Sequence, residues 1–268
     1  MPHKNGATVT MDLGSGGDDA ESKPSCPPQP PSERSLIQRT NMANTLRTPQ
    51  VRTVLDRLFA AATDDDENPR WQRPGLSWET ATAQERSDAS ESAYMPISAE
   101  AGDLLYILVR ARRPNNVIEF GTSYGISTIH LAAAVADNGA GRVISTELSE
   151  TKVSAARANL EEAHLMDRVT ILLGDARATL NDVAGPIDFV LLDGWKDLCL
   201  PVLRSLESRL ALGALIVADD INLSSLSGYL DYVRSPENGY VSVAFPVEDG
   251  MEISCWTADR QLDEEGAL

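Results

Sequence analysis

The sequence is poor in cysteine and lacks long hydrophobic runs. Its 268 residues include three cysteines, Cys26, Cys199 and Cys255, which lie far apart. An odd, scattered set excludes a disulfide framework and a CxxC-type zinc site, and it fits a reducing cytoplasm. No apolar run approaches the roughly 18–20 residues that a membrane helix needs. The N-terminus shows no basic segment followed by an apolar one, so we expect a cytoplasmic protein without a secretory signal.

Positive charge is also scarce. There are 23 lysines and arginines against 40 acidic residues, which gives a formal net charge of −17. Such a charge repels phosphate, so we expect neither a nucleic-acid partner nor binding to an anionic membrane surface. It is compatible with small neutral or cationic molecules and with divalent metal ions. Apolar residues make up 42% of the chain, which is enough for a sizeable core.

The composition changes at about residue 41. Residues 1–41 are rich in Pro, Gly, Ser and Asp without hydrophobic periodicity, and we predict a disordered tail there. Residues 42–268 are predicted to form one domain, in which 42–113 supply N-terminal helices and a lid and 114–257 form the core. In the first part, helical spacing predicts helices over residues 49–62 and 98–112, whereas residues 68–92 are polar and irregular.

After Pro114, strand-like apolar runs alternate with helical stretches. This alternation indicates βαβ units, right-handed crossovers and a mostly parallel sheet. The last two strands flank the short turn Glu248-Asp249-Gly250 and predict an antiparallel hairpin. We therefore predict an α/β fold with a doubly wound, Rossmann-like sheet of seven strands. The predicted strands are 117–120, 142–146, 169–173, 189–192, 214–218, 240–245 and 251–256, and the helices between them are 127–136, 150–163, 198–210 and 226–233.

The first motif that points to a ligand follows the strand at 117–120. The chain turns through Gly121 and Gly125 and enters a helix near Ser127. Glycines let the backbone approach a ligand closely. The pattern is not GxGxxG, and no Lys-Ser/Thr pair follows, so it is neither a dinucleotide fingerprint nor a P-loop. By itself this turn is equally compatible with a purely structural role.

The next two strand ends carry acidic or small residues. A carboxylate at Glu147 can accept hydrogen bonds from both ribose hydroxyls of a nucleoside that lies across the strand ends. The segment Gly174-Asp175-Ala176 ends the following strand, where an adenine ring would lie. Ligands bind at the carboxyl ends of strands in such sheets, so the three strand ends together predict a nucleoside site.

Three further carboxylates follow the next two strands. Asp193 ends the fourth strand, and Asp219 and Asp220 end the fifth, so we expect them to converge. Close unpaired carboxylates raise one another's pKa, and a hard cation such as Mg²⁺ relieves that cost. The alternative is that Asp219 or Asp220 caps the next segment or pairs with Lys196.

These motifs resemble the class I S-adenosylmethionine-dependent methyltransferases. More narrowly, the chain is similar to the small O-methyltransferases typified by the catechol and caffeoyl-CoA enzymes. The resemblance covers about residues 93–257, and its most specific part is the segment 192–197, Leu-Asp-Gly-Trp-Lys-Asp. The other positions that carry it are Met95, Gly102, Glu119, Gly121, Gly125, Ser127, Glu147, Asp219, Asp220 and Gly250.

The resemblance implies a cofactor site and a metal site. Residues 95–98 would lie over the cofactor, and the residues implied to bind it are Met95, Glu119, Gly121, Ser127, Glu147, Asp175, Ala176 and Asp193. Among these, Glu119 and Gly121 would lie beneath its amino-acid part, and Ser127 would hold its carboxylate. Asp193, Asp219 and Asp220 would bind Mg²⁺ or a similar cation. The family usually has Asn where this chain has Asp220, a change that would tighten metal binding, weaken Lewis acidity or mark a metal-free branch.

Lys196 and Asp193 are the predicted catalytic residues. A methyl-acceptor hydroxyl must lose its proton, and a lysine of depressed pKa beside a metal can accept it. The alternative is a surface lysine paired with Asp197. Trp195 fits the wall of an acceptor pocket or a core aromatic. The histidines His130 and His164 are interpreted as structural.

We therefore predict an S-adenosylmethionine-dependent O-methyltransferase that acts on a small hydroxylated, catechol-like or natural-product acceptor with Mg²⁺ assistance. One alternative is a metal-independent O- or N-methyltransferase, in which Asp220 and Lys196 position the substrate. A non-catalytic scaffold is disfavoured by the converging carboxylates, and an NAD-dependent oxidoreductase by the missing third glycine. A homodimer through helices within residues 45–62 stays open.

Overall fold

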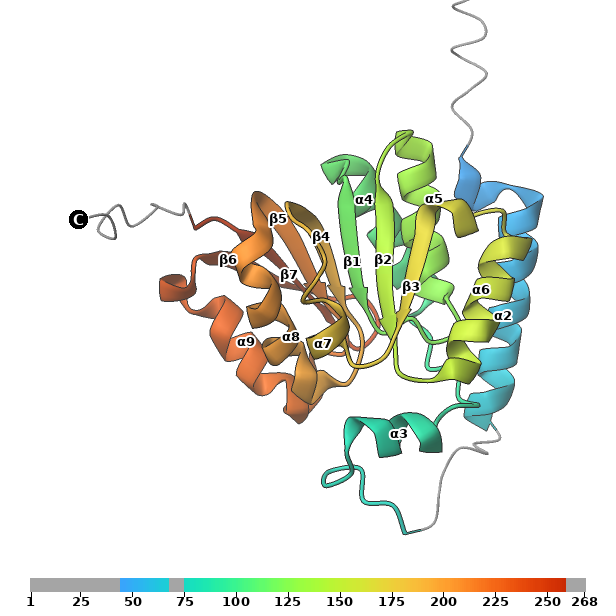
Figure 1. Ribbon diagram of the computed structural model, residues 1–268, viewed down its shortest axis with the longest axis horizontal. Coiled ribbons are helices and arrows are strands. Elements are labelled where there is room, and N and C mark those ends of the chain that lie inside the picture. Colours follow the sequence, from blue (N-terminus) through green and yellow to red (C-terminus); the bar gives the residue numbers. More distant parts are fainter. Residues whose placement is uncertain (1–43, 68–74, 259–268) are drawn as a thin grey trace, which may run out of the picture. The chain divides into compact units, whose positions relative to one another are not determined.

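The computed structural model describes residues 44–67 and 75–258, which form an α/β domain around one seven-stranded sheet (Figure 1). The strand order is β3-β2-β1-β4-β5-β7-β6. Neighbours from β3 to β5 are parallel, and β7 and β6 are antiparallel at one edge. The predicted fold class is confirmed, whereas the predicted tail lies outside the described residues. The strands are β1 (Asn116–Phe120), β2 (Arg142–Glu147), β3 (Val169–Leu173), β4 (Ile187–Leu192), β5 (Leu210–Ala218), β6 (Tyr240–Phe245) and β7 (Met251–Trp256).

Helices cover both faces of the sheet. An apolar cluster lies between the sheet and the helices on each face. There are two clusters because successive side chains of a buried strand point to opposite faces of the sheet. In β1, Val117 belongs to one cluster and Ile118 to the other. On the Val117 face lie α2 (Pro49–Glu67), α4 (Ala99–Arg112), α5 (Ile126–Asn138) and α6 (Glu150–Glu162), and on the Ile118 face lie α7 (Ala176–Thr179), α8 (Cys199–Leu206) and α9 (Ser227–Arg234).

The predicted helix ends agree best with the structure where a capping residue marks them. Ser98 precedes α4 as predicted, and its hydroxyl accepts the Ala101 N–H at 3.1 Å. The helix predicted over 198–210 is shorter, because the chain forms α8 only to Leu206 and β5 begins at Leu210. The 3₁₀ turns around these elements are η1 (Thr45–Arg47), η2 (Met166–Arg168), η3 (Lys196–Leu198), η4 (Glu207–Arg209), η5 (Ser224–Leu226) and η6 (Pro236–Asn238).

The prediction missed two α-helices, the four-residue α7 after β3 and the longer α3. Helix α3 (Ala83–Ala89) lies within residues 68–92, where no regular element was expected. Its signal is a capping box, in which Thr82 accepts the Glu85 N–H while the Glu85 carboxylate accepts the Thr82 N–H. Figure 1 places α3 beyond the carboxyl ends of the parallel strands. Among the described residues, no helix combines the length and apolarity that crossing a membrane requires.

Candidate active site

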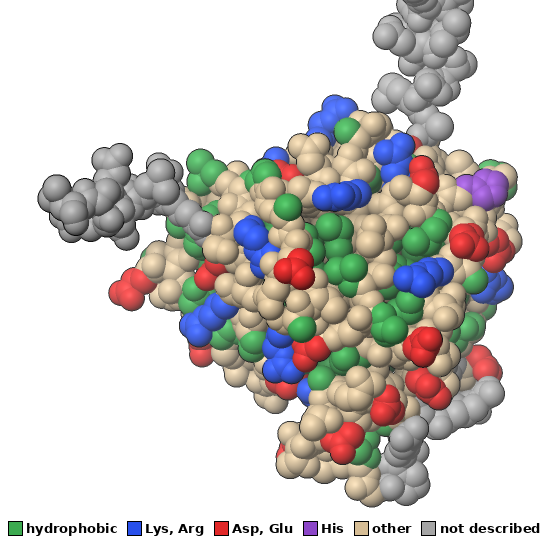
Figure 2. Space-filling view, viewed as in Figure 1, with side chains coloured by type: hydrophobic (Ala, Val, Ile, Leu, Met, Phe, Trp, Pro, Cys, Tyr) green, Lys and Arg blue, Asp and Glu red, His purple; other side chains and the backbone are tan. Residues whose placement is uncertain are grey.

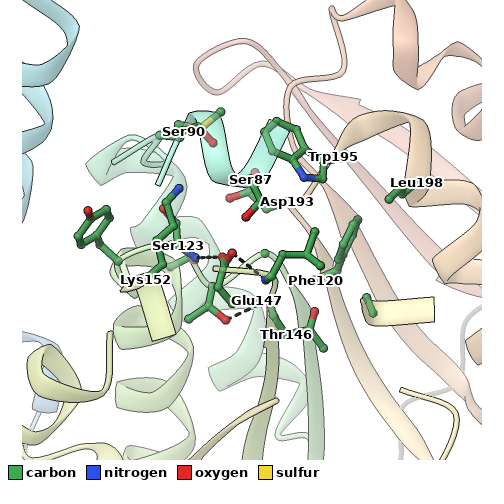
Figure 3. Close-up of a pocket in the computed structure, with 18 of the residues that line it drawn as sticks. Ser87, Ser90, Phe120, Ser123, Thr146, Glu147, Lys152, Asp193, Trp195 and Leu198 are labelled. Atoms are coloured by element: carbon green, nitrogen blue, oxygen red, sulfur yellow. Dashed lines mark hydrogen bonds between the residues drawn. The ribbon is translucent and has the colours of Figure 1, made fainter. Parts of the chain in front are cut away.

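A cavity of about 200 Å³ lies at the carboxyl ends of the central strands (Figure 3). Its position is the one that a doubly wound sheet favours, where neighbouring connections run to opposite faces. Glu119 and Asp219 do not line it. The predicted site residues that do are Met95, Gly121, Ser127, Glu147, Asp175, Ala176, Asp193, Lys196 and Asp220.

The turn after β1 brings two strand ends into contact. Gly121 has a φ of +104°, and a Cβ there would lie 2.7 Å from the backbone oxygen of Asp193. The position therefore requires glycine for both its conformation and its space. Gly125, with a φ of +90°, is the N-cap of α5, and no side chain caps this helix. The expected role of Ser127 in starting the helix belongs to Gly125.

Glu119 supports this turn from inside the protein. Its carboxylate accepts the hydroxyl protons of Ser127 at 2.7 Å, Thr128 at 2.6 Å and Ser145. Burial raises the pKa of Glu119 to about 7, against the opposing effect of these hydrogen bonds. Glu119 thus lies beneath the cavity as expected, but it contacts the helix start and β2 and does not line the ligand space.

Glu147 lines the cavity and is held by backbone amides. One carboxylate oxygen accepts the Ser123 N–H at 2.9 Å, and the other accepts the N–H groups of Leu148 and Ser149 at 2.8 and 2.9 Å (Figure 3). A carboxylate has about four acceptor positions, so three such bonds fix its orientation and leave capacity for a ligand hydroxyl.

Asp175 caps the short helix α7. Its carboxylate accepts the Arg177 N–H and pairs with the Arg177 guanidinium at 2.6 Å. The guanidinium bonds lower the pKa of Asp175. Asp175 and Ala176 both line the cavity at the end of β3, as predicted.

Three carboxylates converge at the ends of β4 and β5. Single oxygen atoms of Asp193, Asp219 and Asp220 lie within 4.8 Å of one another. Asp219 is 4% exposed, and its Oδ1 atom has no hydrogen-bond partner among the described residues. Burial, and then the charge of Asp193, raise the pKa of Asp219 to about 8. The predicted convergence is therefore present.

Lys196 lies within this acidic cluster. Its ammonium contacts Asp193 at 2.9 Å and Asp220 at 3.0 Å. Burial opposes the charged form, but the two carboxylates outweigh it and raise the pKa of Lys196. The expected depressed pKa is thus not found in this arrangement. The expected alternative pairing with Asp197 is absent too, because Asp197 pairs with Arg86.

Several cavity residues were missed by the sequence analysis. Ser87 and Ser90 come from α3 and the residue after it, and Lys152 comes from α6 (Figure 3). Lys152 is 5% exposed and lies 5.9 Å from the centre of the Tyr124 ring. A lysine in a helix gives no sequence signal that separates a cavity position from a solvated one.

The turn between β6 and β7 contacts the start of α4. The Glu248 carboxylate accepts the Ser98 N–H at 2.7 Å, which attaches this turn to the start of α4. Met95, at a φ of +45°, is 49% exposed at the cavity.

On the face shown in Figure 2, acidic, basic and apolar side chains are mixed, and no continuous basic patch is visible.

Comparison with known proteins agrees with this geometry. Residues 118–221 match a family model described as a methyltransferase domain. The chain is 35% identical to catechol O-methyltransferase of Mycobacterium tuberculosis over 142 residues, which are 53% of this chain and 64% of that protein. It is 33% identical to a probable O-methyltransferase of the same organism over 155 residues, 54% of this chain and 65% of the relative. The chain thus spans less than two thirds of either relative.

Solved structures show the same fold. A cofactor-bound protein from M. tuberculosis aligns with a TM-score of 0.59 and 23% identity, over 86% of this chain and all of the other. A Bacillus cereus O-methyltransferase in complex with SAH aligns with a TM-score of 0.55 and 20% identity, over 76% of this chain and all of the other. The resemblance to class I S-adenosylmethionine-dependent O-methyltransferases is therefore confirmed by the family model that residues 118–221 match and by the similarity to these relatives.

Proposed function

We propose that this chain is an S-adenosylmethionine-dependent O-methyltransferase that acts on a small hydroxylated acceptor with the help of a divalent cation. The observation that carries the proposal is the convergence of Asp193, Asp219 and Asp220 beside the cavity. A nucleoside site alone would suit many activities, because a fold does not specify a reaction. A carboxylate cluster next to it suits a hydroxylated acceptor, because Mg²⁺ prefers oxygen ligands and keeps positions for the substrate.

The residues at the ends of β1 and β2 would hold the cofactor. Three amides fix the orientation of Glu147, which would accept a ribose hydroxyl, and the uncapped first turn of α5 would offer N–H groups to a carboxylate. The Ser127 hydroxyl donates to Glu119, so it can only accept from a ligand. When bound, S-adenosylmethionine supplies the electrophilic methyl group.

Asp193, Asp219 and Asp220 fit a divalent cation. Their oxygens lie close enough to share an ion, and the unpartnered Asp219 Oδ1 is a buried acceptor that a cation would satisfy. When bound, such an ion would lower the pKa of an acceptor hydroxyl and offset the repulsion among the carboxylates. The Lys196 ammonium, which contacts Asp193 and Asp220, would compete with a cation for these two carboxylates.

The remaining residues would place the acceptor. Methyl transfer needs the acceptor oxygen, the methyl carbon and the sulfur in line within a site that excludes water. Trp195, Leu198 and Leu223 line the cavity beside the acidic cluster and give it an apolar wall. Lys196 lies between this apolar wall and the acidic cluster. If a cation engaged Asp193 and Asp220, the ammonium would lose its stabilising partners and release a proton to solvent, and the neutral amine could then accept the hydroxyl proton.

A second candidate has an observation in its favour. Lys196 already neutralises part of the cluster, because it contacts both Asp193 and Asp220. This is the arrangement that a metal-independent O- or N-methyltransferase would use, with the three residues positioning the substrate by hydrogen bonds. A cytoplasmic location and a homodimer remain predictions in either case.

Calorimetric titration separates these candidates. S-adenosylmethionine is titrated into the protein with Mg²⁺ and then with EDTA, and methylation of a catechol is measured in both conditions. Binding in both conditions with transfer only in Mg²⁺ is the expected result. Equal transfer in EDTA would favour the metal-independent enzyme. Absence of cofactor binding would contradict the methyltransferase assignment, because a cofactor must bind the folded domain.

A further inference from the structure

Helix α3 covers the cavity with little apolar anchoring. It has seven residues, and the only buried positions within it are Ser87 and Ala89. Neither side chain is large enough to hold a short helix by hydrophobic burial, which scales with the apolar area removed from water. Ser87 and the adjoining Ser90 nevertheless line the cavity (Figure 3). Other contacts must therefore set the position of this helix.

Arg86 attaches α3 to the loop after β4, which contains Trp195 and Asp197. Its two terminal nitrogens bond the two carboxylate oxygens of Asp197, each at 2.9 Å. The guanidinium also lies 4.9 Å from the centre of the Trp195 ring, and its side chain is only 13% exposed. The ring of Trp78 is also in contact with the Trp195 ring, with 5.9 Å between their centroids. Arg86 thus contacts residues on both sides of Lys196 in the chain.

The segment that follows α3 is attached to the turn after β1, where the cofactor is proposed to bind. The Tyr124 hydroxyl donates to the Glu91 carbonyl at 2.9 Å, and the Ser123 hydroxyl donates to the Tyr94 carbonyl at 2.7 Å. The rings of Tyr94 and Tyr124 stack at 4.1 Å. Residues 86–94 therefore span the cavity between the turn after β1 and the loop after β4.

We propose that Arg86 is a positioning residue that fixes the acceptor wall: it acts through Trp195 and Asp197, and it holds α3 over the cavity. The proposal rests on the proposed function for its effect on an acceptor. An arginine suits this role because its planar fork bonds a carboxylate with two parallel hydrogen bonds while its face stacks on an indole. A lysine keeps the charge but provides neither geometry.

The test compares Arg86→Ala and Arg86→Lys with a control, Arg52→Ala. Arg52 belongs to an exposed ion pair with Asp56 on α2, away from the cavity-lining residues. With a catechol as the acceptor, we expect both Arg86 variants to raise its KM by roughly 10-fold or more, since bidentate charge-assisted bonds are the strong ones. The S-adenosylmethionine Kd, measured by calorimetry, should change by less than about 2-fold, because the contacts of residues 91–94 with the cofactor-side turn remain.

A double-mutant cycle with Asp197→Asn tests the mechanism. Asp197→Asn alone should raise the acceptor KM, and Arg86→Ala should raise it less in that background than in the wild type, because the two changes share the guanidinium–carboxylate interaction and only the Trp195 contact is left to lose. Additive effects would overturn the proposal. An equal loss of cofactor affinity and acceptor KM would also overturn it, because α3 would then serve only as a general lid.

Fluorescence separates this proposal from the proposed function. Acrylamide quenching of tryptophan should increase in Arg86→Ala, and the increase should disappear in a Trp195→Phe background. This readout needs no methyl transfer. An inactive wild-type protein with the expected quenching would contradict the enzyme assignment alone. Unchanged quenching together with an unchanged acceptor KM would refute the role of Arg86.

Discussion

The two halves of the carboxyl edge of the sheet treat their acidic residues in opposite ways. At the ends of β1 and β2, Glu119 accepts three hydroxyl groups and Glu147 accepts three backbone amides. At the ends of β4 and β5, the carboxylates share one ammonium, and Asp219 keeps an unpartnered oxygen. The carboxylates at the ends of β1 and β2 thus have hydrogen-bond donors from the protein itself. Those at the ends of β4 and β5 have one ammonium for three carboxylates, so further positive charge would stabilise them.

This difference shows that acidic side chains at the strand ends can serve two purposes, depending on what surrounds them. Neutral donors around Glu119 and Glu147 fix the geometry of these carboxylates, which is what the proposed cofactor site would require. Carboxylates placed against one another at Asp193, Asp219 and Asp220 accumulate negative potential, which favours a cation over a fixed geometry. The contrast can be tested by changing the donors of each half separately.

The largest effect is expected for Lys196→Met. Loss of a general base lowers the transfer rate by roughly 10²–10⁴-fold, which a single-turnover methylation assay would measure. The variant should also gain more thermal stability from Mg²⁺ than the wild type, because no ammonium competes for Asp193 and Asp220. An unchanged transfer rate would place the base elsewhere, and an equal Mg²⁺ stabilisation of both proteins would mean that the ammonium does not compete with a cation for these carboxylates.

At the end of β2, Glu147→Ala should weaken S-adenosylmethionine binding by roughly 10–100-fold, because hydrogen bonds to a charged group contribute about 1.5–3 kcal/mol. Calorimetry gives the Kd, and transfer at saturating cofactor should change much less. Glu150→Ala is the matched control, an exposed acidic residue in the first turn of α6. Equal effects of the two changes would reduce the role of Glu147 to general charge.

The change Asp220→Asn tests the carboxylate cluster at the ends of β4 and β5. Asparagine keeps an oxygen ligand and tolerates the positive φ of 57° at this position, but it removes one charge. We expect Mg²⁺ affinity to fall on the order of 10-fold, with transfer retained at saturating Mg²⁺. The measurement is a Mg²⁺ dependence of the transfer rate. A rate that needs no Mg²⁺ in either protein would favour the metal-independent candidate.

The last prediction concerns Glu119 and the pH dependence of folding stability, and it involves no change in methyl transfer. Its folded pKa of about 7 lies above the ordinary value of 4.5, so the folded protein holds the proton more tightly. The contribution to stability is present below about pH 4.5 and is lost as the pH rises through about 7, by at most about 3 kcal/mol. Glu119→Gln should lack this loss, and urea unfolding of both proteins at pH 5 and pH 8 would measure the difference. A parallel pH dependence in the two proteins would contradict it.

The sequence predicted most of the fold because its apolar periods are strong. The strands at 169–173, 240–245 and 251–256 match the structure residue for residue, since runs bounded by turn residues leave little choice of register. Helix α3 was missed because its inward positions are serine and alanine, so it has no apolar period, although its capping box was present.

The site was predicted in part. Strand ends are defined by sequence, and parallel strands bring their carboxyl ends to one edge, so the convergence of Asp193 with Asp219 and Asp220 followed from topology. Two details did not follow: the raised pKa of Lys196 and the pairing of Asp197 with Arg86. Both depend on distances between segments that the topology leaves open.

The sequence by itself determined which residues stand at which strand end, because that information is local and periodic. Only the tertiary structure decided which carboxylates are satisfied by the protein and which are left for a ligand. Arg86 is the clearest case, since its partner lies 111 positions along the chain in the loop after β4. Electrostatic interactions fall off with distance in space and with solvent exposure, and neither quantity can be read along a chain before it folds.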